Sequence, residues 1–163
     1  MQIIEMKDKH WPAVSQIYLE GISTGNATFE QTCPSWENWD SEHRKDCRLV
    51  AYQSEEVVAW AALSNVSGRC IYSGVCEVSV YVRKQHQKMG IGRELLNSLI
   101  KESEEHEVWT LQAGIFPENI GSIKLHKKLG FSEVGIRRKI GKMNGVWRDV
   151  ILLERRSEIT GID

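Results

Sequence analysis

A glycine-rich, cationic turn between a β-branched run and an amphipathic run limits what this chain can fold into. The segment is YVRKQHQKMGIGRELL, residues 81–96, and it places Gly90 and Gly92 where the helical pattern begins. A helix N-terminus presents unpaired N–H groups and partial positive charge, and glycine lets an anion approach that backbone closely. The turn therefore predicts a strand, an anion-binding loop and a helix in succession.

Two familiar anion-binding patterns fail on spacing. A dinucleotide-binding fingerprint needs a third small residue where this chain has Leu95, and a P-loop needs Gly-Lys-Ser/Thr where it has Gly92-Arg93. The pattern that remains is Q-x-x-G-x-G over residues 87–92, followed by Arg93. The plainer alternative stays open, in which Gly90 and Gly92 only shape a tight strand-to-helix connection.

Hydrophobic periodicity predicts strands and helices in mixed order along the chain. Strand-like runs cover residues 2–6, 48–52, 57–63, 76–82 and 108–115, and two more flank Asn144-Gly145, a hairpin turn signal. Helical patterns cover residues 11–21 with Asp8 as N-cap, 36–45 with Ser35 as cap, the run from Ile91 to Ile100, and 119–129 before Gly130. We expect an α/β fold, a mixed sheet flanked by about four helices.

Length and composition narrow the class of protein. At 163 residues we expect one domain over residues 1–157 and a flexible tail over 158–163. Nucleic acid is not an expected partner, because 21 basic residues face 22 acidic ones. No apolar run approaches the roughly 20 residues that span a bilayer, and residues 1–12 lack the apolar region of a signal peptide, so we expect a cytoplasmic protein.

The cysteines give no metal signal. They form no C-x-x-C pair and have no partner histidines at zinc spacing; they are Cys33, Cys47, Cys70 and Cys76. We therefore expect reduced thiols and no metal.

Several segments in the same order resemble the GCN5-related N-acetyltransferases (GNAT), and within them the phosphinothricin and arsinothricin branch. They are ATFEQTCPS, EVSVYV, the turn, PENIGSIKLHKKLGF and GKMNGVWRDVILLERRS, and together they cover nearly the full chain. The resemblance implies acetyl-CoA as cosubstrate, no metal, a small-molecule amine as acceptor and a homodimer. Reaction type transfers more safely than substrate identity, since acceptors vary widely on one fold.

The resemblance also implies which residues bind acetyl-CoA. The pyrophosphate loop corresponds to Gln87, Lys88, Met89, Gly90, Ile91, Gly92 and Arg93. The strands at 77–82 and 110–115 are expected to splay, so that Val80 and Val82 meet the pantetheine arm through main-chain groups. Asn119 and Ser122 would contact the same arm, although Asn119 as a simple helix cap is an open alternative.

Catalytic and acceptor residues follow from the same comparison. Glu77 stands at the position of the family's general base, and alternation puts it on one strand face with Ser79 and Tyr81. His126 occupies the position of a proposed acid, where it would protonate the leaving thiolate or orient water. Arg69 aligns with an arginine near the acidic group of the acceptor, and Phe29 would form an apolar wall.

We therefore expect an N-acetyltransferase that acts on the α-amine of an amino-acid-like toxic compound of the phosphinothricin, arsinothricin or methionine sulfoximine type. Two alternatives remain open. One is a protein N-terminal or polyamine acetyltransferase. The other is a non-catalytic acyl-CoA-binding or sensing domain, which would keep residues 87–93 but could dispense with Glu77 and His126.

Overall fold

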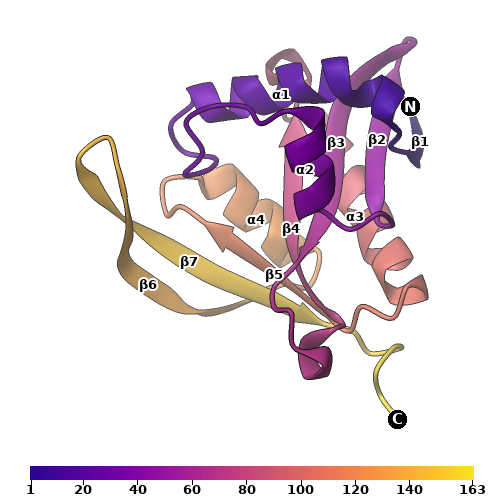
Figure 1. Cartoon of the computed structure of the whole chain (residues 1–163), viewed down its shortest axis with the longest axis vertical. Helices are drawn as coiled ribbons and strands as arrows, with labels where there is room; N and C mark the ends of the chain where they lie inside the picture. The colour runs from indigo at the N-terminus through magenta and orange to yellow at the C-terminus, as the bar shows by residue number, and fades with distance from the viewer.

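A seven-stranded mixed sheet forms the centre of the computed structural model, which describes residues 1–163 (Figure 1). The strands lie in the order β1-β2-β3-β4-β5-β7-β6, and β4 and β5 form its parallel pair. Their bounds are β1 Gln2–Glu5, β2 Arg48–Gln53, β3 Glu56–Asn65, β4 Val75–Val82, β5 Thr110–Ile115, β6 Ser132–Met143 and β7 Val146–Arg156. The predicted mixed sheet is confirmed.

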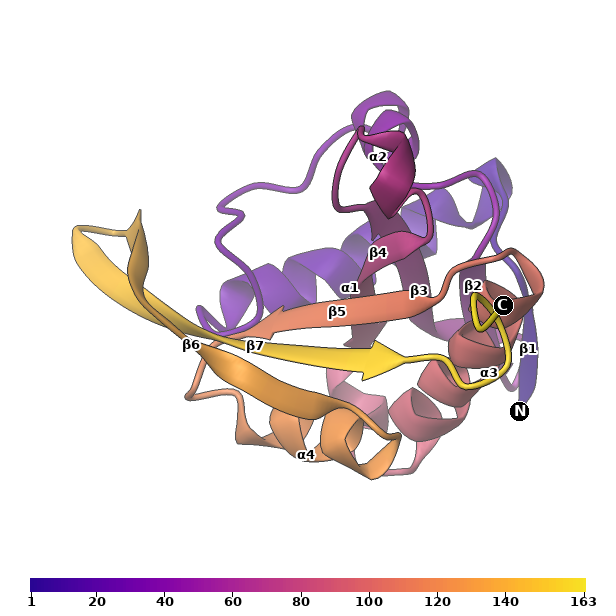
Figure 2. The same ribbon diagram turned by 90° about the horizontal axis from the view of Figure 1, so that it is seen from below.

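Four α-helices cover the two faces of this sheet (Figure 2). On one face lie α1 (Trp11–Ser23) and α2 (Trp36–Glu42), and on the other lie α3 (Ile91–Glu105) and α4 (Ile120–Lys128). Each face buries its own apolar cluster, and the α3 side holds the larger one. Strand β4 alternates between them as predicted: Val78, Val80 and Val82 pack on the α3 side, and Tyr81 packs on the α1 side.

Several helix ends and the β6–β7 turn lie where the sequence predicts them. Ser35 Oγ accepts the N–H of Asn38 at 3.2 Å, which makes Ser35 the N-cap of α2. Gly130 follows α4 with φ +89°, as a helix-ending glycine does. Asn144 and Gly145 both have positive φ, 49° and 78°, and join β6 to β7 as a tight hairpin.

The expected bounds of two helices are wrong. Asp8 opens a 3-10 turn (Asp8–His10), and His10 rather than Asp8 is the N-cap of α1. The same helix runs past Gly21 to Ser23, because Gly21 serves close packing: a Cβ there would lie 2.6 Å from the ring of Tyr81. Helix α2 ends at Glu42, before the predicted end at residue 45.

The residues after β7 form a turn held by hydrogen bonds within the tail. Ser157 Oγ accepts the N–H groups of Ile159 and Thr160, and the Arg156 guanidinium donates to the carbonyls of Thr160 and Gly161. Flexibility of residues 158–163 stays a prediction.

None of the four helices combines the length and the apolar character that crossing a membrane requires.

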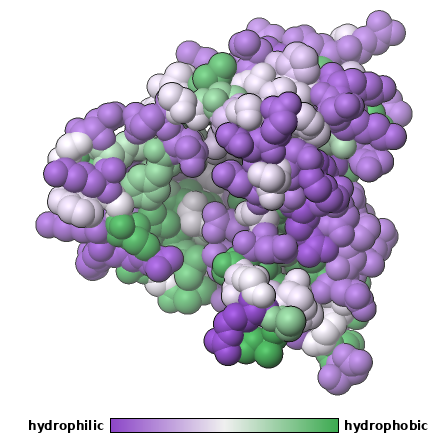
Figure 3. Space-filling view, in the orientation of Figure 1, coloured by the Kyte–Doolittle hydropathy of each residue, from purple (hydrophilic) through white to green (hydrophobic).

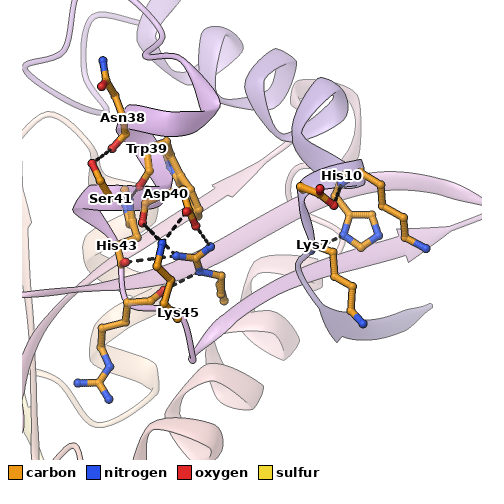
Figure 4. Close-up of polar contacts among 12 residues, drawn as sticks. Lys7, His10, Asn38, Trp39, Asp40, Ser41, His43 and Lys45 are labelled. Atoms are coloured by element: carbon orange, nitrogen blue, oxygen red, sulfur yellow. Dashed lines mark hydrogen bonds and ion pairs between the residues drawn. The ribbon is translucent and has the colours of Figure 1, made fainter.

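One buried cation attaches α2 to the sheet. Arg48, only 5% exposed, donates from Nη1 to Asp40 Oδ1 at 2.5 Å, and its guanidinium lies 5.2 Å from the centroid of Trp39. Lys45 also contacts Asp40, and hydrogen bonds from Lys45 and then Arg48 lower the pKa of that carboxyl group (Figure 4). The ion pair and the indole together fix α2 over the start of β2.

We predict that Arg48→Ala lowers the free energy of unfolding by about 2–4 kcal/mol, because it removes one partner of a buried ion pair and its stacked indole. Lys45→Ala is the matched control, since Lys45 binds the same carboxylate with a side chain that is 71% exposed. That pair should contribute less than about 1 kcal/mol. Urea unfolding measures both variants, and equal losses would contradict the assigned role of Arg48.

Candidate functional site

The site is a fork in the sheet where β4 and β5 separate. Their parallel pairing covers only three residue pairs and ends at Glu77–Gln112. Beyond that point the strands border a cleft of about 860 Å³, lined by Val78–Val82 on one side and Ala113–Phe116 on the other. Figure 3 shows the hollow at the centre of this face, with hydrophobic residues on the side of β6 and β7. The predicted splaying of these strands is confirmed.

Backbone groups of β4 point into the cleft. Leu63 on β3 lies opposite Val78 on β4, and it donates its N–H to the Cys47 carbonyl, on the side away from β4. Leu63 and Val78 are therefore a non-hydrogen-bonded antiparallel pair, in which Val78 directs its N–H and C=O away from β3. By the two-residue alternation, Val80 and Val82 do the same. Their side chains meanwhile pack on the α3 cluster. Unpaired main-chain donors and acceptors therefore line the fork, and an extended polar chain can pair with them.

The glycine turn stands at one end of this cleft, as the N-terminus of α3. Gly90 is the N-cap with φ +85°, and Lys88 also has positive φ, 64°. Gln87 Nε2 donates to the Val82 carbonyl at 3.2 Å, which ties the turn to the end of β4. Lys88 and Arg93 line the cleft beside the free N–H groups of the first helical turn. This end of the cleft suits a phosphate group.

Gly92 leaves its side-chain position in the cleft open. A Cβ there would lie 3.4 Å from Val82 Cγ2 and 3.5 Å from Leu125 Cδ2, which are ordinary contacts. A larger residue at this position therefore meets no steric obstacle within the fold. The added atoms would occupy the cleft, since Gly92, Val82 and Leu125 all line it.

Helix α4 contributes three residues on the same side. Asn119 Oδ1 accepts the Ser122 N–H at 3.3 Å, so Asn119 is the N-cap, and both residues line the cleft. His126 lines it too, 4% exposed, with its ring edge against Phe131. Its Nδ1 lies 2.7 Å from the Ser122 carbonyl, an atom that only accepts hydrogen bonds, so Nδ1 carries the proton. Nε2 is left with a lone pair, and burial lowers the pKa of this imidazole.

A carboxylate stands at the vertex of the fork. Glu77 is the last β4 residue that pairs with β5, and its Oε2 accepts a hydrogen bond from Gln112 Nε2 at 3.1 Å. Phe29 lines the cleft nearby, edge-on to Phe116 with ring centroids 4.8 Å apart. The fork thus joins two openings. Gly90, Gly92 and α4 lie towards one face of the sheet, and the loop at 24–30, α2 and Glu77 lie towards the other.

Two residues of this region could not be found by motif: Arg148, which contacts residues of the cleft lining, and His43, which belongs to the lining. Arg148 on β7 connects three segments: it donates to the Gly25 carbonyl and Asn26 Oδ1, both at 2.9 Å, and it pairs with Glu118 at 3.2 Å. Its guanidinium also lies 4.0 Å from the centroid of Phe116. His43 lines the cleft from the end of α2. These residues come from distant parts of the chain, so no local spacing signals them.

Three predicted site residues do not line the cleft. Arg69 is exposed and begins the 3-10 turn Cys70–Tyr72, with its guanidinium 5.5 Å from the Tyr72 centroid. Ile91 is 4% exposed and belongs to the α3 core, because it starts the apolar face of that helix. Met89 is 59% exposed on the outside of the turn. Lining the cleft at the turn are Gln87, Lys88, Gly90, Gly92 and Arg93.

One group of metal-ligand types lies away from the cleft. Ligand atoms of Cys47, Glu102 and His106 come within 4.8 Å of one another at the C-terminal end of α3. The Cys47 N–H already donates to Glu102 Oε1 at 3.0 Å, and His106 Nδ1 contacts the Glu102 carbonyl at 2.9 Å. Hydrogen bonds therefore account for this group, and the cleft chemistry does not involve it.

Comparison with known proteins agrees with this geometry. The model of an acetyltransferase (GNAT) domain matches residues 35–152. A phosphinothricin N-acetyltransferase of Alcaligenes faecalis is 30% identical over 160 residues, covering 92% of this chain and 79% of that protein. A ribosomal-protein-alanine N-acetyltransferase of Brucella melitensis is 31% identical, with a TM-score of 0.89 over 96% of this chain and 100% of that one. An acetyltransferase of Salmonella typhimurium, solved with its cofactor acetyl-CoA, is 25% identical, with a TM-score of 0.88 over 100% and 98% of the two chains.

We predict that Gly92→Val folds normally but binds CoA about 10- to 100-fold more weakly, because its side chain fills the cleft beside the phosphate-binding N–H groups. This position tests the loop better than Gly90, whose positive φ strains any other residue. Gly135→Val is the control, since a Cβ at Gly135 meets nothing within 4 Å and the residue lies on β6. Titration calorimetry with CoA gives the affinities, and unchanged binding by Gly92→Val would remove the loop assignment.

Proposed function

The chain belongs to the GNAT family of acetyltransferases, and we propose that this N-acetyltransferase acetylates the α-amine of a small amino-acid-like compound. The observation that carries the proposal is the fork, which joins a phosphate-binding turn to a carboxylate at its vertex. Acetyl-CoA supplies the acetyl group as a thioester. Because the relatives are named as N-acetyltransferases, we do not retain the alternative of a non-catalytic sensing domain.

In this proposal the cosubstrate lies along the fork. The turn residues Gly90 and Gly92 bind its pyrophosphate, and the main-chain groups of Val80 and Val82 pair with its pantetheine arm. Free N–H groups on β4 would also polarise the thioester carbonyl as negative charge develops on its oxygen. Asn119 and Ser122 border the same space from α4.

Glu77 is the proposed general base. An amine acceptor arrives mostly as an ammonium ion, which must lose a proton before nitrogen can attack. The carboxylate of Glu77 stands where the two openings of the cleft meet, and Gln112 orients it. His126 is proposed to orient the reacting groups or a water through the lone pair of Nε2. Donation of a proton to sulfur is less suited to it, since Nδ1–H is committed to Ser122 and burial disfavours the imidazolium.

The chemical identity of the acceptor is the more specific part of the proposal. The relative from Alcaligenes faecalis is named for phosphinothricin, and a phosphinate or carboxylate on such an acceptor suits the guanidinium fork of Arg69. Phe29 would pack against the apolar part of the acceptor. Arsinothricin and methionine sulfoximine belong to the same chemical class, and the same contact from Arg69 is proposed for them.

A second candidate acceptor is a protein N-terminus or a polyamine. The Brucella melitensis relative is named for an alanine of a ribosomal protein. Four carboxylates line the cleft, Glu30, Glu42, Glu77 and Glu118, and the lysine and arginine that line it, Lys88 and Arg93, lie at the turn. That charge distribution favours a cationic acceptor, so acceptor charge is the property to test.

The homodimer and the cytoplasmic location stay predictions. Apolar side chains exposed on the β6–β7 hairpin offer surface for a second copy, and they include Val134, Ile136, Val146 and Trp147.

We predict that Glu77→Gln keeps CoA affinity and lowers kcat about 100- to 1000-fold near pH 7, within the usual range for loss of a general base. The deficit should shrink at high pH, where more of the acceptor amine is already neutral. Thiol release at saturating substrates measures kcat, with Glu94→Gln on α3 as a control outside the cleft. An unchanged kcat would make Glu77 structural.

We predict that Arg69→Ala lowers kcat/KM for a phosphinate amino acid about 10- to 100-fold and leaves the acetyl-CoA KM unchanged, because one charge-assisted contact is lost. Arg69→Lys should recover only part of the activity, since it keeps the charge but not the planar fork. Alkylamines and N-terminal peptides are measured alongside. Should they outperform the amino-acid analogues, or should Arg69→Ala act normally on them all, the second candidate would replace the first.

A further inference from the structure

His43 is a cleft residue to which neither motif nor mechanism has yet assigned a role. It follows α2 directly and lines the cleft together with Glu42, Ser64 and Glu77. Its ring stacks on Trp39 with centroids 4.0 Å apart and an interplanar angle of 16°. Trp39 is itself buried, and the Arg48 guanidinium lies over its ring. The imidazole is therefore held in one orientation.

One hydrogen bond decides which nitrogen of His43 carries the proton. Nδ1 lies 2.7 Å from the Trp39 carbonyl, which only accepts hydrogen bonds, so Nδ1 is the protonated nitrogen. Nε2 then has a lone pair and no hydrogen-bond partner among the protein atoms. A neutral imidazole in this tautomer is a proton acceptor.

The backbone places His43 near the vertex of the fork. Arg44, the next residue, donates its N–H to the Leu63 carbonyl on β3 at 2.9 Å. Ser64 follows Leu63 and pairs with Glu77 across β3 and β4. His43 and Glu77 therefore lie on either side of Ser64, and all three line the cleft on the α2 face of the sheet.

We propose that His43 relays to solvent the proton that Glu77 removes from the acceptor amine. This inference rests on the proposed acetyl transfer and adds the route by which the base is regenerated. Without such a route, a protonated Glu77 in the cleft would have to release its proton directly before the next turnover.

The protons balance in this scheme. An ammonium acceptor loses two protons as it becomes an amide: one before attack and one as the new C–N bond forms and the C–S bond breaks. The departing CoA thiolate takes one of them. The other passes from Glu77 through cleft water to Nε2 of His43 and then to bulk solvent. One proton is released for each amide formed.

The charges around His43 suit transient rather than permanent protonation. Burial is the main cause that lowers the pKa of His43 below its usual 6.5, and Arg48 adds to it. The Trp39 carbonyl and the carboxylates of Glu42 and Asp40 act in the opposite direction. The guanidinium of the next residue, Arg44, is paired with Asp46, and Glu77 faces the same cleft from β4. The imidazole is therefore neutral near pH 7.

The test is the pH profile of kcat for His43→Asn. The asparagine amide can keep the donor to the Trp39 carbonyl but has no group at the position of Nε2. We expect kcat at pH 7 to fall about ten-fold, less than the loss of roughly 100- to 10,000-fold for a group that acts directly on the substrate, because water can still accept the proton; the acetyl-CoA KM should not change. Wild-type kcat should decline as pH falls through the lowered pKa of His43, and this limb should be absent in the variant.

Two further measurements separate a relay from a structural role. His106→Asn is the matched control, because His106 contacts a carbonyl four residues back on α3 in the same way and lies outside the cleft. It should keep the wild-type profile. His43→Gly should regain several-fold activity when millimolar imidazole is added, and thermal melting checks that each variant is folded.

The assay uses the best wild-type acceptor among amino-acid analogues, alkylamines and N-terminal peptides, so an error about acceptor class leaves this test intact. A folded His43→Asn with the wild-type pH profile, or a His43→Gly that imidazole does not rescue, would overturn the relay. Glu77→Gln is profiled separately: if it is fully active while His43→Asn is impaired, the proton reaches His43 without Glu77 and the scheme proposed here is wrong.

Discussion

The pairing of β4 and β5 stops after three residue pairs, and the rest of the site depends on this short contact. If the parallel pairing continued, the N–H and C=O groups of β4 and β5 would bond to each other and no cleft would form between the strands. Because the strands part at Glu77 and Gln112, main-chain groups of β4 beyond that pair, above all those of Val80, remain available inside an otherwise apolar sheet. The same separation lets one cleft open towards both faces, so that two substrates can meet at the vertex.

Charge is divided along this cleft. The helix N-terminus, Lys88 and Arg93 make one end suited to phosphate, and carboxylates of Glu30, Glu42, Glu77 and Glu118 line the remainder. Two histidines of the cleft lining share one arrangement. His126 and His43 each commit Nδ1–H to a carbonyl four residues earlier and leave Nε2 free. Burial keeps both neutral, so the cleft contains proton acceptors without added positive charge.

The stability of α2 and the chemistry of the cleft are connected through Trp39. Arg48 holds Asp40 and lies over this indole, and the indole supports the ring of His43. A short helix of this kind contributes little by itself, since isolated helices of this length are marginal in water. The tertiary contacts of the buried Trp39 therefore position the side chain of His43, which lines the cleft. Arg148 performs a similar task on the other side, where it joins β7 to the loop at 24–30 and to Glu118.

The sequence by itself determined the elements whose cause is local. Neighbouring residues determine the helix caps, the hairpin turn, the alternation of β4 and the glycine turn before α3; the caps are Ser35 and Asn119, and the hairpin turn is Asn144-Gly145. The order of several such segments along the chain indicated the family. Only the tertiary structure decided where β4 and β5 part, which nitrogen of His43 and His126 carries the proton, and that Arg69 lies outside the cleft lining while Arg148 lies beside Phe116. These depend on contacts between segments up to 123 positions apart, as from Arg148 to Gly25. No spacing within a motif records such contacts, because packing rather than local propensity brings the segments together.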